Sequence, residues 1–250
     1  MKFLRPAAAL AFLLAMTGTS GSPAYAQMSK VLKIVAPNEV ASLEPTSGAG
    51  FVFLRLGVGE TLVAMTDDGG IRPGLAASWT PSEEGRAWTL ALRPGVMFHD
   101  GSPLRASAVV GSLKRIADGS QGIKLAGITS IEADGDDKVV LRTSAPNAVL
   151  PALLTEAGTI ILAPSSVGAD GRTQAVIGTG PYRVTKIEGK VEVETRRHTA
   201  YWGPAPSIEA VTYVAATNPE TRANIAAAGD ADMVFNLLPS AVSRVQGGQM

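Results

Sequence analysis

Two adjacent side chains, His99 and Asp100, have the types that general acid–base chemistry requires, an imidazole base and a carboxylate to orient it. A hydrolase of that kind also needs a nucleophile, and the chain has neither a Gly-x-Ser-x-Gly nor a Ser-x-x-Lys pattern. Gly101 and Ser102 follow, and together with Asp100 they are typical of a tight turn. The pattern therefore favours a hairpin corner over a catalytic site.

A protein-built metal site is also disfavoured by the residue types present. The chain has no cysteine and two histidines, His99 and His198, which are far apart in the sequence. Lack of cysteine excludes thiolate ligands, a disulfide framework and a lipid-modified N-terminal cysteine. The paired carboxylates Glu83-Glu84 and Asp136-Asp137 lie in turns beside glycine, where solvation accounts for them. We therefore predict no catalytic residue, no metal ion and no other cofactor.

Binding a ligand requires less chemistry than catalysis, and several loops have suitable residues. Loops at the carboxyl ends of strands commonly form the ligand crevice of α/β proteins. The candidate loops follow Ala36 and surround residues 60–64 and 177–181. Large apolar side chains there suit either a cleft or the core, and an arginine suits either a ligand carboxylate or a solvated helix face. The predicted ligand-binding residues are Asn38, Phe51, Phe53, Arg55, Thr179 and Trp202.

The elements that must position these residues are clearest between Trp88 and Arg115. Trp88, Leu90 and Leu92 alternate with less apolar residues, which predicts a half-buried strand. Pro94-Gly95 supplies a turn, and apolar residues at helical spacing predict a helix from about Arg105.

Elsewhere the pattern predicts a mixed sheet with hairpins and flanking helices, an α/β fold. Residues 31–36 read as a strand, residues 51–62 as a helix, and residues 128–133 and 138–143 as a hairpin. Near the C-terminus a strand, a helix capped by Asn218 and ended by Gly229, and a parallel buried strand over residues 232–237 are expected.

Residues 1–26 have the pattern of a cleaved export signal. Lys2 and Arg5 precede a short apolar run, and Ala24-Tyr25-Ala26 is a small-x-small cleavage site before Gln27. The run is shorter than the ~20 residues that span a bilayer. The chain has 22 basic and 22 acidic residues, so neither a basic patch for nucleic acid nor a polybasic membrane anchor is expected. These features together favour a periplasmic protein.

Three separated motifs resemble the peptide/nickel family (family 5) of extracellular solute-binding proteins, the secreted receptors of ABC importers. Residues 92–104, LRPGVMFHDGSPL, are similar to the family's Leu-Arg-x-Gly-Val-x-Phe-His-Asp-Gly and Pro-Leu signature. Residues 178–182, GTGPY, and residues 201–206, YWGPAP, follow in the family's order. One departure is Arg105, which stands where the family has a Ser or Thr helix cap, so the helix is expected to begin at Ser107 or to fray.

The resemblance implies a periplasmic-binding-protein-like type II fold, in which two α/β lobes close on a ligand. Residues 27–237 would then form lobe I, and residues 238–250 would begin the crossover to a second lobe that is absent from this sequence. Without that lobe, a ligand meets one wall of a cleft, so weak or no binding by the 250 residues alone is expected.

The implied function is to capture a peptide or small organic solute and deliver it to a membrane permease with ATPase subunits. The receptor would act as a monomer. A secreted hydrolase on the same fold and a ligand sensor without transport are the alternatives. Nickel receptors of the family carry an arginine-containing aromatic segment before the Pro-Ser match. Residues 156–161 of this chain contain neither an arginine nor an aromatic residue, which favours peptides, opines or other organic solutes over chelated nickel.

Overall fold

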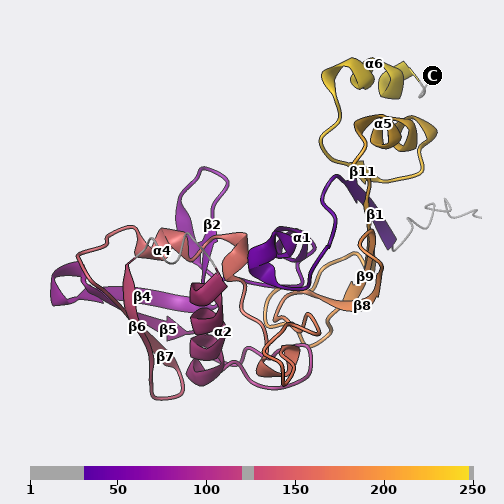
Figure 1. The fold of residues 1–250 in the computed structure, drawn as a ribbon. Helices are drawn as coiled ribbons and strands as arrows, with labels where there is room; N and C mark the ends of the chain where they lie inside the picture. The colour runs from indigo at the N-terminus through magenta and orange to yellow at the C-terminus, as the bar shows by residue number, and fades with distance from the viewer. Residues whose placement is uncertain (1–30, 120–126, 248–250) are drawn as a thin grey trace, which may run out of the picture.

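The computed structural model describes residues 31–119 and 127–247, so the predicted export signal lies outside the described residues. The described chain forms two larger sheets and one two-stranded sheet, joined by loops and short helices (Figure 1). Among these described residues, no helix combines the length and the hydropathy needed to cross a membrane.

The first sheet has five strands in the order β11-β1-β10-β9-β8. Strand β1 pairs in parallel with β10 on one side and with β11 on the other. The carboxyl ends of these three strands therefore lie along one edge of the sheet, where α/β proteins commonly bind ligands. The bounds are β1 Val31–Ala36, β8 Tyr182–Glu188, β9 Glu192–Arg197, β10 Ala210–Ala215 and β11 Met233–Val234.

The second sheet is antiparallel, in the order β4-β5-β7-β6, and the helix α2 (Ala106–Gly119) packs on it (Figure 1). The predicted strand and hairpin are confirmed as β5 and the β6–β7 pair. The helix begins one residue before the expected Ser107, because the Ala106 N–H donates to the Asp136 carbonyl. The bounds are β4 Ala76–Ser82, β5 Ala87–Leu92, β6 Ile128–Asp134 and β7 Lys138–Thr143.

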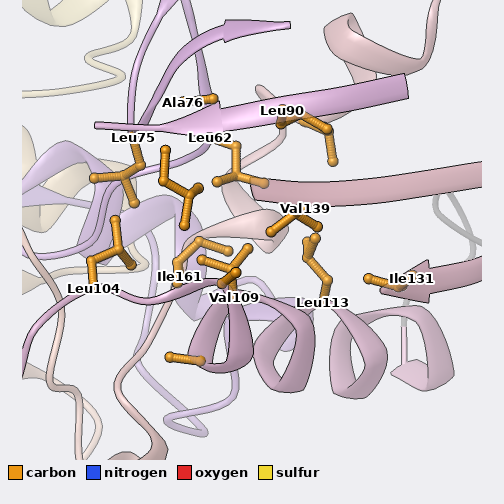
Figure 2. Close-up of a cluster of buried hydrophobic side chains, with 14 of the residues drawn as sticks. Leu62, Leu75, Ala76, Leu90, Leu104, Val109, Leu113, Ile131, Val139 and Ile161 are labelled. Atoms are coloured by element: carbon orange, nitrogen blue, oxygen red, sulfur yellow. The ribbon is translucent and has the colours of Figure 1, made fainter. Parts of the chain in front are cut away.

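A large apolar core fills the space between α2 and the second sheet (Figure 2). Figure 2 shows Val109 and Leu113 pointing from α2 toward Leu90 of β5 and Val139 of β7. All four side chains are almost completely buried. The apolar residues that alternate in β5 and those at helical spacing in α2 therefore pack in one core, as the sequence pattern predicts.

A second core lies between the first sheet and the short helix α1 (Ala49–Arg55). Phe53 of α1, Val193 of β9 and Tyr213 of β10 are each nearly or completely buried within it. This core anchors α1 beside the carboxyl edge of the first sheet. The remaining elements are η1 Pro45–Ser47, β2 Val63–Met65, β3 Ile71–Pro73, η2 Glu83–Gly85, α4 Leu150–Leu153, η3 Ala157–Thr159, η4 Pro164–Ser166, α5 Pro219–Ala228 and α6 Pro239–Gly247.

Two predicted elements differ from the structure in extent. The helix expected over residues 51–62 covers Ala49–Arg55, because Gly57 adopts a positive φ of 64° that ends a helix. The strand expected over residues 232–237 covers only Met233–Val234, and Met233 is 43% exposed rather than buried. Asn236, at φ 57°, turns the chain out of the strand. The parallel pairing of β11 and both caps of α5 are confirmed.

Candidate functional site

Side chains from two distant segments converge on the carboxylate of Glu60. Its Oε2 accepts hydrogen bonds from Thr179 Oγ1 at 2.8 Å and from Trp202 Nε1 at 2.9 Å. Its Oε1 accepts from Tyr201 Oη at 2.9 Å. Thr179 belongs to the GTGPY motif and Tyr201 and Trp202 to the YWG motif, so Glu60 joins two motifs that lie far from it in sequence. We call this cluster the Glu60 junction.

The glycines of the GTGPY motif allow its backbone to lie against the loop after α1. The N–H of Gly180 donates to the carbonyl of Val58 at 3.1 Å. A Cβ on Gly178 would lie 2.1 Å from the Val58 carbonyl oxygen, and one on Gly180 would lie 2.2 Å from the Gly57 carbonyl oxygen. These distances are far below van der Waals contact, so the two glycines serve close packing rather than phosphate binding.

The ring of His99 binds the backbone of the same GTGPY motif. Its Nε2 donates to the Gly180 carbonyl at 3.0 Å, and its Nδ1 accepts from the Gly178 N–H at 3.3 Å. Burial lowers the pKa of His99 to about 4, so the ring is neutral at physiological pH. Both ring nitrogens are therefore engaged with backbone, in agreement with the predicted structural corner.

The electrostatics of the Glu60 junction follow from its burial. Burial raises the pKa of Glu60 above its ordinary value of 4.5, and the three donated hydrogen bonds and the Arg93 charge oppose this rise only in part. Burial and the nearby Glu60 carboxylate raise the pKa of Tyr201. The Arg93 guanidinium stacks on Trp202, with Cζ 4.4 Å from the ring centroid.

A hollow of about 220 Å³ lies beside the junction, with Glu60, Arg72, Tyr201 and Trp202 at its polar side. Pockets that enclose small ligands are typically ~300–1,000 Å³. The hollow is smaller than that, and the donors around Glu60 already have partners within the protein. The junction is therefore better suited to fixing the relative positions of its three segments than to enclosing a ligand.

A second cluster lies at the carboxyl edge of the first sheet, and we call it the strand-edge face. Phe51 and Arg55 lie one helical turn apart on α1, and Phe235 directly follows β11. The Arg55 Cζ lies 4.3 Å from the Phe51 ring centroid and 4.1 Å from that of Phe235. Beside them, the Tyr213 hydroxyl donates to the carbonyl of Asn38 at 2.7 Å.

The strand-edge face is open to solvent. Phe51 is 42% exposed, Arg55 and Asn38 are exposed, and Phe235 is half-buried. Burial raises the pKa of Tyr213, and the positive charge of Arg55 opposes that rise, which places the guanidinium near this hydroxyl. Aromatic surface and a cation thus share one exposed patch, with the backbone of Asn38 beside it, and both groups are available to a small solute.

The six predicted ligand-binding residues fall into two groups and one exception. Asn38, Phe51 and Arg55 lie together on the strand-edge face, and Thr179 and Trp202 meet at the Glu60 junction. Phe53 is completely buried in the second core, so its ring has no surface to offer a ligand. Sequence reasoning missed Glu60, Tyr201 and Phe235. The available signals were a carboxylate within the otherwise apolar stretch of residues 56–63 and an aromatic residue directly after a strand.

Acid–base and metal chemistry find little support in the described residues. Across residues 31–119 and 127–247, no group of three or more His, Cys, Asp or Glu side chains is placed to hold a metal ion. Asp100 accepts from Ser102 and from Ser165 Oγ, and these contacts stabilise the turn beside His99. The strongest features of the site are thus a rigid junction and an exposed aromatic–cationic face.

Comparison with known proteins agrees with this arrangement. A family model described as "Bacterial extracellular solute-binding proteins, family 5 Middle" matches residues 70–249. A nickel-binding periplasmic protein of Escherichia coli K12 is 29% identical over 232 residues, which cover 84% of this chain and 44% of that protein. The glutathione-binding protein GsiB of Escherichia coli O1:K1 is 27% identical over 168 residues, covering 64% of this chain and 33% of that protein.

Among solved structures, a nickel ABC transporter protein from Bacillus halodurans superposes with a TM-score of 0.79 at 29% identity, covering 87% of this chain and 45% of that one. The fold is therefore that of type II periplasmic binding proteins, and the chain spans less than half the length of the curated relatives it matches. The family model covers most of the chain, and the motifs that it contains meet at the Glu60 junction. The chain belongs to the bacterial extracellular solute-binding proteins of family 5.

Proposed function

We propose that this protein is the solute-binding component of an ABC importer, which captures a peptide or small organic solute in the periplasm and delivers it to a membrane permease with ATPase subunits. The observation that carries the proposal is the shared fold, since 87% of the chain superposes on a nickel ABC transporter protein with a TM-score of 0.79. The export pattern of residues 1–26 supports a periplasmic location, with cleavage after Ala26.

We place the solute contacts on the strand-edge face. Asn38, Phe51 and Arg55 lie beside the carboxyl ends of β1 and β11, the position at which open α/β sheets commonly bind ligands. The Glu60 junction, with Thr179 and Trp202, has a supporting role, because it fixes the loop that follows α1. Phe53 supports the same helix from within the core.

A chelated nickel ion is the second candidate solute. Two relatives favour it, because the Escherichia coli protein is named as nickel-binding and the Bacillus halodurans structure as a nickel ABC transporter. The lack of an arginine or aromatic residue in residues 156–161 favours an organic solute instead. Binding rather than catalysis is proposed, since both ring nitrogens of His99 bond to backbone and the chain has no nucleophile motif.

Two measurements test the proposal. Calorimetry of the 250-residue chain against dipeptides, tripeptides, glutathione, an opine and nickel–histidine should show weak binding of one solute class at most, without turnover. Deletion of the gene should then reduce uptake of that solute by cells. Turnover of the solute by pure protein would favour the hydrolase alternative. Binding with unchanged uptake in the deletion strain would favour the sensor. Neither binding nor a change in uptake for any member of the panel would contradict the proposal.

A further inference from the structure

The strand-edge face has a stacked guanidinium whose hydrogen-bonding edge is available. Phe51 and Phe235 lie 4.3 and 4.1 Å from the Arg55 Cζ, each measured to the ring centroid. Stacking on aromatic rings engages the flat faces of a guanidinium, whereas its five N–H donors point outward in its plane. Within the part of the chain that the structure describes, Arg55 makes no hydrogen bond or ion pair with another side chain.

Arg115, an arginine whose side chain is largely buried, provides a comparison, because its hydrogen-bond donors have a partner within the protein. Its Nη1 reaches both carboxylate oxygens of Glu44, at 2.5 and 2.6 Å, and the side chains of both residues are largely buried. The donors of this guanidinium are thus satisfied by an internal carboxylate. Arg55 has two aromatic neighbours in place of that carboxylate, and its donors face solvent.

The surroundings of Arg55 hold it in place before any ligand arrives. Phe53, two positions before Arg55 on α1, anchors the helix in the second core. On the opposite side, the buried Arg222 donates to the carbonyls of Ala216 and Asn236, which ties the segment after β11 to the segment after β10. Phe235 is thus attached to a fixed backbone. Such preorganisation lowers the entropy lost when a ligand binds.

On these grounds we infer that the Phe51–Arg55–Phe235 stack is a carboxylate-binding site and that the solute carries a free carboxylate. This inference rests on the proposed function and narrows its substrate class. A carboxylate accepts two parallel hydrogen bonds from the edge of a guanidinium, and the flanking rings restrict the orientations that the guanidinium adopts. The apolar part of the solute lies against the exposed ring of Phe51.

The test compares two probes that differ only at the carboxylate. N-acetyl-dialanine with a free carboxyl terminus and its C-terminal amide are titrated into the 250-residue chain, and backbone amide shifts in residues 49–56 and 233–237 are followed by NMR. The acid is expected to bind about tenfold more tightly than the amide, which corresponds to one charge-assisted hydrogen-bonded pair. Shifts are expected in both segments, because the stack joins them.

Variants then assign the preference to Arg55. Arg55→Gln should abolish the preference for the acid, and Arg55→Lys should retain part of it, because an ammonium binds a carboxylate as a point charge without the bidentate geometry. Arg196→Gln is the matched control, since it removes the same charge from an exposed position on β9 and should preserve the preference. Circular dichroism establishes that each variant is folded.

Three results would overturn the inference. They are equal affinity of the wild type for acid and amide, a preference that survives in Arg55→Gln, and absence of shifts near the stack with either probe. The comparison of acid with amide on the wild type needs no variant, so a misfolded Arg55→Gln protein would not prevent a decision. If the calorimetric panel finds a solute while this comparison fails, the proposed function stands and the carboxylate site does not.

Discussion

Replacing Glu60 tests the claim that one carboxylate holds three segments together. In Glu60→Ala, the hydroxyl of Thr179 and the indole N–H of Trp202 lose their acceptor, as does the hydroxyl of Tyr201. Each buried donor left without a partner costs about 1–3 kcal/mol. Thr179 is completely buried, while Tyr201 and Trp202 are half-buried and have some access to water. We therefore expect a loss of about 3 kcal/mol in the free energy of unfolding.

Glu60→Gln separates the hydrogen bonds from the charge. The amide oxygen can accept from Thr179 and Trp202, and the amide nitrogen can donate to Tyr201, so a loss of about 1 kcal/mol or less is expected. Glu132→Ala is the control, because it removes an exposed carboxylate that pairs with Arg142 at 3.1 Å and should cost under about 1 kcal/mol.

The pH dependence adds a second, independent readout. Burial raises the pKa of Glu60 in the folded state above its ordinary value of 4.5, so the folded protein holds this proton more tightly than the unfolded chain does. The contribution of Glu60 to stability is therefore greatest below pH 4.5 and falls as the pH rises through the folded-state pKa. Glu60→Gln should lack this component.

Urea unfolding followed by circular dichroism between pH 4 and pH 8 measures both effects. Two outcomes would refute the reasoning. The first is a Glu60→Ala protein as stable as the Glu132→Ala control. The second is a pair of parallel stability profiles for the wild type and Glu60→Gln.

Three further predictions concern the corner, its glycines and the mature N-terminus. Because burial lowers the pKa of His99 from 6.5 to about 4, its contribution to stability is present above pH 6.5 and lost as the pH falls toward 4. His99→Gln should remove that dependence in urea unfolding and leave solute affinity within a few-fold, and a hundredfold loss of affinity would contradict the structural role. Gly180→Ala places a Cβ 2.2 Å from the Gly57 carbonyl oxygen and should lower the melting temperature sharply, whereas Gly111→Ala, with open space in α2, should raise stability by about 0.5–1 kcal/mol. N-terminal sequencing of periplasmic protein should begin at Gln27, and a start elsewhere would refute the proposed cleavage site.

Much of the fold could be predicted from the sequence wherever local signals decide the outcome. The alternation in β5, the Asp-Gly turn between β6 and β7, and the Asn218 and Gly229 caps of α5 each depend on residues within one element. The extents of α1 and β11 could not be predicted. They are set by the left-handed conformations of Gly57 and Asn236, whose carbonyls accept hydrogen bonds from Tyr182 and Arg222 of distant segments.

The site was predictable only in part, for a related reason. The search was confined to loops after strands and the elements beside them, and three of the six chosen residues share the strand-edge face. The partner that organises Thr179 and Trp202 could not be identified, because Glu60 lies 119 and 142 positions away from them. The sequence also could not predict which aromatic residues are exposed. Phe51 and Phe53 are two positions apart on a helix, so they point in different directions, and the position of the sheet decides which one is buried.

The helix α1, which carries both Phe51 and Phe53, also connects the strand-edge face to the Glu60 junction. Phe53 packs α1 into the second core, and the loop that follows α1 is fixed by Gly178 and Gly180 and, through Glu60, by Thr179. The motifs shared with the family therefore act on the binding face indirectly, by setting where α1 ends and how it lies on the sheet. On the proposed function, the residues that confer solute preference lie on the exposed side of the same helix, at Phe51 and Arg55. If the proposed solute contacts are right, a chain can keep all three motifs and still change its solute, so the motifs identify the family whereas the strand-edge face determines the ligand.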